Sequence, residues 1–301
     1  MPQSQFHVII IGGSYAGLSA AMSLGRSLRN VLVIDSGKPC NVSTPHSHNF
    51  LTQDGKTPNE IRQFARKQVE QYKTITFLDD TAVKGIKTNQ GFEITVGSGQ
   101  TFSAKKLVFA TGISDQLPDI KGLKECWGKS VVHCPYCHGY EFHGQRTAIL
   151  ANGENAMHYA LLVSNLTKDL TVLSNGKSDL TEEQLTKLAK HKINVIETEV
   201  SEIIHANGSV KEVMLDDKSK LSFDAIYFRP PFVQHSDIPV SLGCELTDQG
   251  HIKVDAMQNT TIEGVYACGD NCSPMRAVAN AVSTGNFAGA VINKDLAVEM
   301  F

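Results

Sequence analysis

A run of β-branched residues that leads directly into a glycine-rich turn constrains this chain most. The run "HVIII" (7–11) predicts a buried strand, "GGSYAGLSAAMSLGRS" a turn that continues into an Ala/Leu-rich helix, and "VLVID" (31–35) a second buried strand. Strand, glycine turn, helix and strand form a βαβ unit. Because such crossovers are right-handed and join parallel strands, the chain is expected to contain a parallel sheet covered by helices.

The turn itself predicts a site for a dinucleotide. The pattern G-x-G-x-x-G falls on residues 12–17, Gly12-Gly13-Ser14-Tyr15-Ala16-Gly17, in which Gly12 and Gly17 match its outer glycines and Ser14 stands at the middle glycine. Glycine lets backbone N–H groups approach a pyrophosphate, and the N-terminus of the following helix favours the anion. Asp35 ends the next strand, where a carboxylate accepts hydrogen bonds from ribose hydroxyls. The alternative is a glycine turn that only packs the helix on the strand.

Further along the chain the same pattern begins again. After a helix around 58–72 and an apolar strand within 101–112, residues 147–166 again indicate strand, turn and helix, and 170–176 the next strand. Two prolines end a strand at 226–232, and 264–270 resumes the style of the first part. At 301 residues, about two domains are expected. We therefore predict an α/β fold with two Rossmann-like, three-layer dinucleotide-binding domains, the second (114–233) inserted between two segments of the first (1–113 and 234–301).

The C-terminal part adds a second turn of this kind. In "GVYACGD" a strand ends at Gly269 and Asp270, and a helix rich in small residues is expected to begin around Met275. An aspartate there could bind a ribityl hydroxyl, and the helix N-terminus could face the polar edge of a flavin. A strand–turn–helix unit with an Asp cap is the alternative.

Two cysteines in "VVHCPYCHGYEF" (131–142) carry the reactive chemistry. Cys134 and Cys137 could bind zinc together with His133, His138 or His143, but all these ligands fall within a shorter stretch than zinc sites normally use. They could also form a buried structural pair. Two thiols at this spacing can close a small, reducible disulfide, whose exchange requires a thiolate. The sequence "CPYC" also occurs in glutaredoxin-like proteins, but the two nucleotide-type units around it here favour flavin chemistry.

Four motifs together resemble the low-molecular-weight thioredoxin reductase family: "IIGGSYAGLSAA", "ATG" (110–112), the C-x-x-C pair and "GVYACGD", in that order and spacing. The resemblance implies two Rossmann-like domains, a bound FAD, a redox disulfide on the inserted domain and a homodimer. Carried over by position, it assigns to FAD the residues Gly12, Gly13, Ser14, Ala16, Gly17, Asp35, Asn49, Val83, Thr111, Gly112, Gly269, Asp270, Arg276, Ala277 and Val278.

The same resemblance suggests roles at the cysteine pair. Cys137 would exchange electrons with the flavin, and Cys134 with an external dithiol or disulfide. His138 stands where thioredoxin reductases usually have an acidic residue, and an imidazole can act as acid or base near neutral pH. A histidine without a catalytic role is the alternative. The sequence "CHGYE" resembles the gliotoxin- and holomycin-type dithiol oxidases of this superfamily.

The expected site for NAD(P)H departs from the family pattern. Ala151 replaces the first glycine of the second turn, and Ser174, Asn175 and Gly176 stand where the family has a His-Arg-Arg-type cluster for the 2′-phosphate. Without arginine partners a 2′-phosphate loses strong charge-assisted bonds. We therefore expect the binding of NAD(P)H to be weakened or lost.

These patterns predict an FAD-dependent dithiol–disulfide oxidoreductase that oxidises dithiols and passes electrons to oxygen or another acceptor. The alternatives are an NAD(P)H-dependent thioredoxin reductase and a non-enzymatic flavin-bearing redox sensor. A small dithiol or disulfide, or a thioredoxin-like protein, is the expected partner. A net charge of −3 gives no reason to expect nucleic acid or membrane binding, and no metal is expected. The chain shows neither a secretory signal nor an apolar run of ~20 residues, so a cytoplasmic location is expected.

Overall fold

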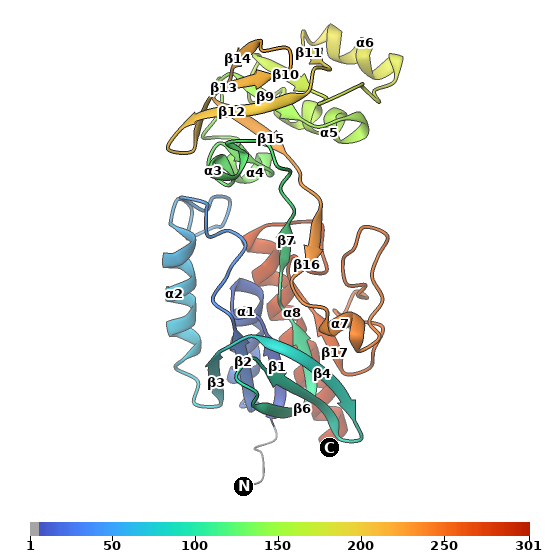
Figure 1. Cartoon of the computed structure of the whole chain (residues 1–301). Coiled ribbons are helices and arrows are strands. Elements are labelled where there is room, and N and C mark those ends of the chain that lie inside the picture. The colour runs from blue at the N-terminus through green and yellow to red at the C-terminus, as the bar shows by residue number, and fades with distance from the viewer. Residues whose placement is uncertain (1–5) are drawn as a thin grey trace. The chain divides into compact units, whose positions relative to one another are not determined.

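The computed structural model describes residues 6–301 (Figure 1). Residues 1–5, part of the stretch used above to argue against a secretory signal, lie outside the described residues. Internal contacts divide the chain into two compact units. Unit 1 comprises Met1–Val42, Asn49–Ser114 and Phe232–Phe301, and unit 2 comprises Ser43–His48 and Asp115–Pro231. Within residues 6–301, no helix combines the length and apolar character needed to cross a bilayer.

Unit 1 contains the elements from both ends of the chain. They are β1 (Phe6–Ile11), α1 (Tyr15–Arg26), β2 (Val31–Asp35), α2 (Pro58–Val69), β3 (Ile75–Asp79), β4 (Ala82–Thr88), β5 (Gly91–Val96), β6 (Thr101–Phe109), β7 (Ile113–Asp115, its last residue in unit 2), β16 (Phe232–Gln234), α7 (Ile238–Ser241), β17 (Val265–Ala267) and α8 (Val278–Met300).

The main sheet of unit 1 has the order β3-β2-β1-β6-β5-β4, and β17 also pairs with β6. The strands β3, β2, β1, β6 and β17 are parallel, whereas β4 and β5 form an antiparallel hairpin that continues the sheet. Ile10 of β1 lies in register with Val33 and Val108. The run "HVIII" is apolar on both of its faces because this strand is buried at the centre of the sheet.

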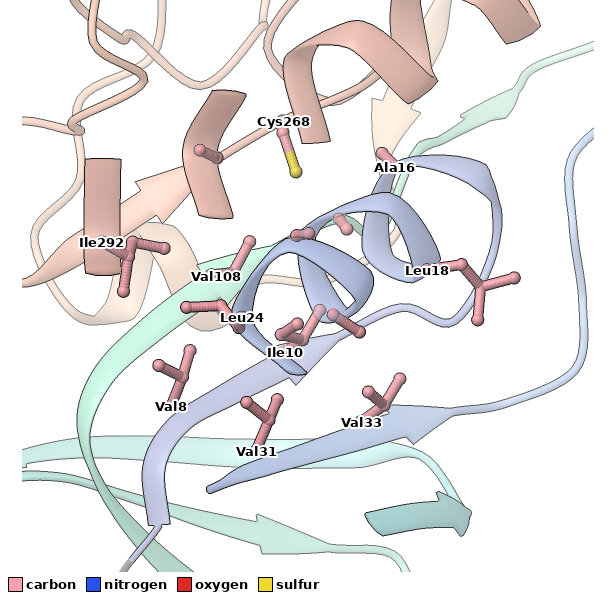
Figure 2. Packing of buried hydrophobic residues seen from close by; sticks show 14 of the residues in the cluster. Val8, Ile10, Ala16, Leu18, Leu24, Val31, Val33, Val108, Cys268 and Ile292 are labelled. Atoms are coloured by element: carbon pink, nitrogen blue, oxygen red, sulfur yellow. The ribbon is translucent and has the colours of Figure 1, made fainter. Parts of the chain in front are cut away.

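Helices α1 and α8 cover one face of this sheet. Leu18 and Leu24 of α1 and Ile292 of α8 pack against side chains such as Val8 and Val108 (Figure 2). The two helices approach closely because α8 carries glycines where it meets α1. A Cβ atom at Gly285 would lie 2.1 Å from the carbonyl oxygen of Ala16, so this position cannot accept a side chain without displacing backbone.

Unit 2 contains the elements from the middle of the chain. They are α3 (Leu123–Cys126), β8 (Val131–Val132), α4 (Pro135–His138), β9 (Thr147–Leu150), α5 (Gly153–Val163), β10 (Leu170–Leu173), α6 (Glu182–Lys190), β11 (Asn194–Ile196), β12 (Val200–Ala206), β13 (Ser209–Leu215), β14 (Lys220–Ser222) and β15 (Ala225–Phe228).

A parallel sheet of order β11-β10-β9-β15-β8 forms the centre of unit 2. Side chains of α5 and α6 pack on one face of it, and the antiparallel sheet β12-β13-β14 packs on the other together with α3. Unit 2 therefore has the predicted strand, turn and helix at its start and three layers.

One element boundary agrees with its prediction and one differs. The strand predicted to be stopped by two prolines within 226–232 is β15, which ends at Phe228 because the prolines at 230 and 231 cannot donate to a ladder. The helix expected around Met275 begins at Val278, because Ala277 adopts an extended conformation as its N-cap residue. The structure also places Ser43–His48 with unit 2, although these residues fall in the stretch predicted to belong to the first domain.

The contact between α1 and α8 predicts that replacing Gly285 with alanine lowers stability, although helix propensity alone would predict that it raises stability. In an exposed helix, Gly→Ala stabilises by about 1 kcal/mol, but at Gly285 the new methyl group would overlap the Ala16 carbonyl oxygen. We expect Gly285→Ala to lower stability by about 1–3 kcal/mol, seen as a lower midpoint of thermal unfolding. Asn286→Ala, at the exposed neighbouring position, is the control and should leave the midpoint unchanged or slightly raised. A midpoint for Gly285→Ala at or above that of the parent would contradict this packing.

Candidate nucleotide and disulfide sites

The first glycine turn is held by the backbone of its own sheet. Gly12 has a φ of +108°, and its N–H donates to the carbonyl oxygen of Ile34 at 2.8 Å. A Cβ atom at Gly12 would lie 2.2 Å from the carbonyl oxygen of Ala110, and one at Gly17 would lie 1.8 Å from that of Gly12. Both glycines are thus required by close backbone packing, and this packing places the start of α1 directly beyond the end of β1.

The first turn of α1 lacks a side-chain cap. Ser14, its N-cap residue, is extended, and its hydroxyl makes no capping hydrogen bond. Ala16 is buried in the following turn. In a helix of 12 residues, uncapped N–H groups and the helix dipole favour an anion at this end.

Asp35 lies beside this turn at the end of β2. A Cβ atom at Gly13 would lie 2.8 Å from that of Asp35, so the glycine gives the carboxylate room next to the turn. The guanidinium of Arg62, on α2, lies 3.6 Å from the Asp35 carboxylate. A cavity of about 340 Å³ opens here and is lined by Asp35, Ser36, Gly37, Arg62, Arg66, Asp79, Asp80 and Thr81.

The ends of β6 and β17 bring further predicted residues together. The N–H of Cys268 donates to the carbonyl oxygen of Phe109 at 3.0 Å, and the buried amide of Asn271 donates to the same oxygen at 2.7 Å and to Thr111 Oγ1 at 3.4 Å. Gly112, with a φ of +65°, follows Thr111. The predicted residues after β6 therefore lie beside those after β17.

Gly269 and Asp270 connect this region to both helices. A Cβ atom at Gly269 would lie 2.9 Å from that of Ala16, and its N–H donates to Thr284 Oγ1 of α8 at 3.1 Å. The Asp270 carboxylate lies 3.9 Å from Nε of Arg276, in the segment Arg276, Ala277 and Val278 that begins α8.

Two further predicted residues lie on other segments of unit 1, Asn49 before α2 and Val83 on β4. Asn49 has a φ of +59°, and its N–H donates to the near neighbour Asp54 at 2.7 Å. Val83 is 57% exposed. Their assignment to a cofactor rests on the resemblance alone.

Sequence reasoning missed Arg62, Asn271 and the cavity beside Asp35. Asn271 follows Asp270 directly and is fully buried, so the "GDN" sequence held a signal for it. Arg62 is brought to Asp35 only by the packing of α2, which no local pattern records.

Cys134 and Cys137 form a disulfide at the short helix α4. Cys134 caps this helix, and its Sγ accepts a hydrogen bond from the N–H of Cys137 at 3.1 Å. Among residues 6–301, no group of three or more His, Cys, Asp or Glu side chains is arranged to hold a metal ion.

His138 and His133 are partly buried, whereas His143 is exposed. Burial lowers the pKa of His138 to about 4, a carboxylate at Glu141 acts in the opposite direction, and His48 adds to the lowering. The imidazole is therefore neutral around pH 7 and can accept a proton. His143, in contrast, lies against the exposed ring of Tyr140, with ring centroids 5.1 Å apart.

The second turn, at the start of α5, is occupied by the chain itself. The side chain of Asn152 caps the helix by accepting a hydrogen bond from the N–H of Gly153 at 2.8 Å, and it accepts another from the N–H of Asp179 at 2.8 Å. Its amide donates to the carbonyl oxygen of Lys177, also at 2.8 Å. The loop after β10 is thereby tied to the turn.

Ser174 and Asn175, which stand where the family has its arginine cluster, also make hydrogen bonds that hold this loop. Ser174 is buried, and its hydroxyl donates to the carbonyl oxygen of Gly176 at 2.7 Å. The side chain of Asn175 accepts a hydrogen bond from the N–H of Val200 at 2.7 Å. Asn175 and Gly176 both have positive φ, at +53° and +118°. These polar groups hydrogen-bond to the backbone of the chain itself and so hold the loop in place. None of them carries a positive charge that could pair with a phosphate.

Comparison with known proteins agrees with this geometry. A family model described as pyridine nucleotide-disulphide oxidoreductase matches residues 6–285. The thioredoxin reductase tcpT of Claviceps purpurea is 33% identical over 305 residues, which cover 97% of this chain and 94% of the relative.

Solved structures lead to the same family. An oxidoreductase from Agrobacterium tumefaciens is 37% identical, with a TM-score of 0.92 over 98% of this chain and 99% of that one. A putative thioredoxin reductase, TrxB, from Bacillus anthracis is 29% identical, with a TM-score of 0.93 over 98% and 100%. The predicted resemblance to thioredoxin reductases and the predicted fold class are confirmed. The chain belongs to the pyridine nucleotide-disulphide oxidoreductase family and is a flavin-dependent disulfide oxidoreductase.

Proposed function

We propose that this chain is an FAD-dependent dithiol oxidase: it oxidises small dithiols to disulfides through Cys134 and Cys137, and the electrons pass by way of FAD to oxygen or another acceptor. One observation supports this direction of the reaction: the turn expected to bind NAD(P)H is closed by hydrogen bonds of Asn152 to its own loop.

The residues of unit 1 fit FAD. The uncapped N-terminus of α1 offers N–H groups to a pyrophosphate, and Asp35 beside the cavity suits the ribose hydroxyls of an adenosine. The proposed contacts are those assigned by the resemblance: Gly12, Gly13, Ser14, Ala16, Gly17, Asp35, Asn49, Val83, Thr111, Gly112, Gly269, Asp270, Arg276, Ala277 and Val278. FAD, when bound, supplies the acceptor to which the reduced cysteine pair returns two electrons.

Gly12→Ala tests this cofactor site. The added methyl group would overlap the Ala110 carbonyl oxygen and force the turn away from the end of the sheet, so we expect purified protein with little or no FAD. The measurement is the ratio of flavin absorbance at ~450 nm to protein absorbance, a band characteristic of oxidised flavoproteins. Gly99→Ala is the control, because Gly99 also has a positive φ but open space around it. Full flavin content in folded Gly12→Ala protein would remove this turn from the cofactor site.

The chemistry at the cysteine pair balances as a dithiol oxidation. One substrate thiol gives its proton to His138, and its thiolate attacks Cys134 Sγ, so that the enzyme disulfide breaks and Cys137 leaves as a thiolate. The second substrate thiol then attacks the substrate sulfur bound to Cys134, and Cys134 leaves with the second proton as a thiol. The substrate loses two electrons and two protons, and the cysteine pair gains both electrons. Assigning Cys137 to the flavin and Cys134 to the substrate follows the resemblance.

Cys134→Ser and Cys137→Ser should each abolish oxidation of a small dithiol such as dithiothreitol, because neither variant can form the enzyme disulfide. Both should keep their flavin, since the disulfide lies in unit 2 and the proposed cofactor contacts in unit 1. In Cys134→Ser, the remaining Cys137 thiolate should give a long-wavelength charge-transfer band with oxidised flavin. Appearance of this band in Cys137→Ser alone would reverse the assigned roles, and retained turnover in both variants would contradict a disulfide mechanism.

The closed second turn argues against NAD(P)H as the electron donor. A pyrophosphate at the start of α5 would have to displace the hydrogen bonds of Asn152 to Lys177 and Asp179, each worth about 0.5–1.5 kcal/mol. Glu154, in the first turn of α5, adds a negative charge at the same end and is itself hydrogen-bonded to Gln184 at 2.7 Å.

We expect dithiothreitol to bleach the bound flavin readily under anaerobic conditions, whereas NADPH and NADH at ordinary working concentrations should do so slowly or not at all. Stopped-flow absorbance of the flavin measures all three reductants in the same way. Asn152→Ala, which releases the loop, should admit nicotinamide nucleotides better than the parent does. Rapid, saturable reduction of the parent protein by NADPH would contradict the proposal.

That last outcome would favour the second candidate function, an NAD(P)H-dependent thioredoxin reductase, with a thioredoxin-like protein as the substrate. Relatives named as thioredoxin reductases, such as tcpT, support this candidate. For either function we propose a cytoplasmic homodimer, as expected from the sequence and the resemblance.

A further inference from the structure

A short segment far from the disulfide motif in the sequence packs in the same unit as that motif. Ser43–His48 belongs to unit 2, although the chain before and after it belongs to unit 1. The segment fits because Gly128 has no side chain: a Cβ atom there would lie 2.5 Å from Ser43 Oγ. Ser47, next to His48, is buried. The segment is thus packed into unit 2, and it carries a histidine at its end.

His48 pairs with a carboxylate that follows the disulfide motif. Its Nε2 lies 3.4 Å from Oε1 of Glu141, with side chains 22% and 37% exposed. Glu141 comes three residues after His138, just beyond the end of α4. The pair joins the segment 43–48 to the chain that carries Cys134, Cys137 and His138.

The same two groups act on His138 with opposite signs. Burial is the main influence on this imidazole and lowers its pKa; the Glu141 carboxylate favours its protonated form, and His48 disfavours it. Other titratable groups pack here: His46 lies beside His48, with ring centroids 6.4 Å apart, and two tyrosines lie nearby. Tyr227 of β15 is coupled to Glu141, and burial raises its pKa, so it stays neutral; Tyr159 of α5 donates its hydroxyl to the carbonyl oxygen of His133 at 2.7 Å. Glu141 is therefore the anion of this cluster, and His48 is its partner.

We propose that Glu141 and His48 form a positioning pair for His138: the Glu141 carboxylate stabilises the imidazolium that forms when His138 accepts the proton of the substrate thiol, and His48 holds that carboxylate in place. This inference rests on the proposed function and assigns two residues to it. The physical need is clear, because a buried imidazole that gains a proton becomes a charge in a poorly solvated site. A fixed carboxylate nearby lowers the cost of that charge, as an aspartate does for the histidine of a Ser-His-Asp triad.

The sharpest test is the titration of His138 itself, which does not depend on turnover. We would follow it by NMR in ring-¹³C-histidine-labelled, disulfide-form holoprotein, with the His138 signal assigned by its loss in His138→Asn. Glu141→Gln removes the anion and should shift the titration of His138 to lower pH by about one unit or more. His48→Gln keeps a hydrogen-bond donor for Glu141 but removes the imidazole that disfavours the protonated form of His138, so it should shift the titration to higher pH.

Controls separate these shifts from a general effect of lost charge. Glu183→Gln and His191→Gln change an exposed carboxylate of α6 and the exposed histidine at its end, and neither should move the His138 signal. Glu141→Asp keeps the carboxylate and should keep most of the parent's titration. If Glu141→Gln does not fold, the titrations of His48→Gln and Glu141→Asp still decide the matter.

Turnover supplies the second readout. With dithiothreitol, Glu141→Gln should lower kcat by about 10–100-fold, a range typical for groups that orient a reactive residue, and Glu141→Asp should recover most of the loss. His138 titrations that do not move in Glu141→Gln and His48→Gln, or a kcat that is unchanged in Glu141→Gln, would overturn the positioning pair. Turnover of His138→Asn as fast as the parent would likewise overturn the pair, because His138 would not be the base, whereas a parent protein that does not oxidise dithiols would show that the proposed function itself fails.

Discussion

The ends of β1, β6 and β17 all come close to the start of α1, and the rest of unit 1 depends on this close packing. The turn at Gly12 passes so near the Ala110 carbonyl oxygen that no side chain fits between them, and Gly17 lies as close to Gly12 itself. This contact fixes the direction of α1 over the sheet, and α8 then packs on α1 through Gly285. Since the carboxyl ends of parallel strands lie along one edge, the residues with ligand-binding groups are gathered there as a consequence of backbone packing.

Unit 2 repeats this architecture but uses its turn differently. The start of α1 lacks a side-chain cap, whereas the start of α5 is capped by Asn152, which also binds the loop after β10. Buried or constrained polar groups are normally hydrogen-bonded, and here the partners belong to the chain itself. The same fold thus leaves the helix start without a side-chain cap in one unit and caps it in the other. A few polar side chains make the difference.

Features that depend on a local sequence pattern, such as strands and turns, were predicted from the sequence. Contacts between segments that are far apart in the chain were not. Continuous apolar strands such as residues 7–11 and the glycine turn gave the parallel sheets, and Asp35 could be placed because it directly ends a strand. The positions of Arg62 beside Asp35, and of His48 beside Glu141, result from contacts between distant segments with no periodicity of their own. The prolines set the predicted end of the strand at Phe228, whereas the last helix begins a few residues later than predicted, at Val278, because its N-cap residue is extended. The roles of the predicted cofactor residues remain predictions.

The way in which the chain passes between its units bears on how such a protein can be rearranged in evolution. The backbone crosses after residues 42, 48, 114 and 231, so the unit with the disulfide is assembled from two separate stretches of the gene. Recombination at the two outer borders of residues 115–231 would transfer the cysteines, His138 and Glu141 as one cassette. It would leave His48 behind in the recipient's own version of the 43–48 segment. The redox motif therefore cannot be transferred by residues 115–231 alone. In such a chimera, Glu141 would face whatever residue the recipient has in place of His48, unless both stretches were exchanged together.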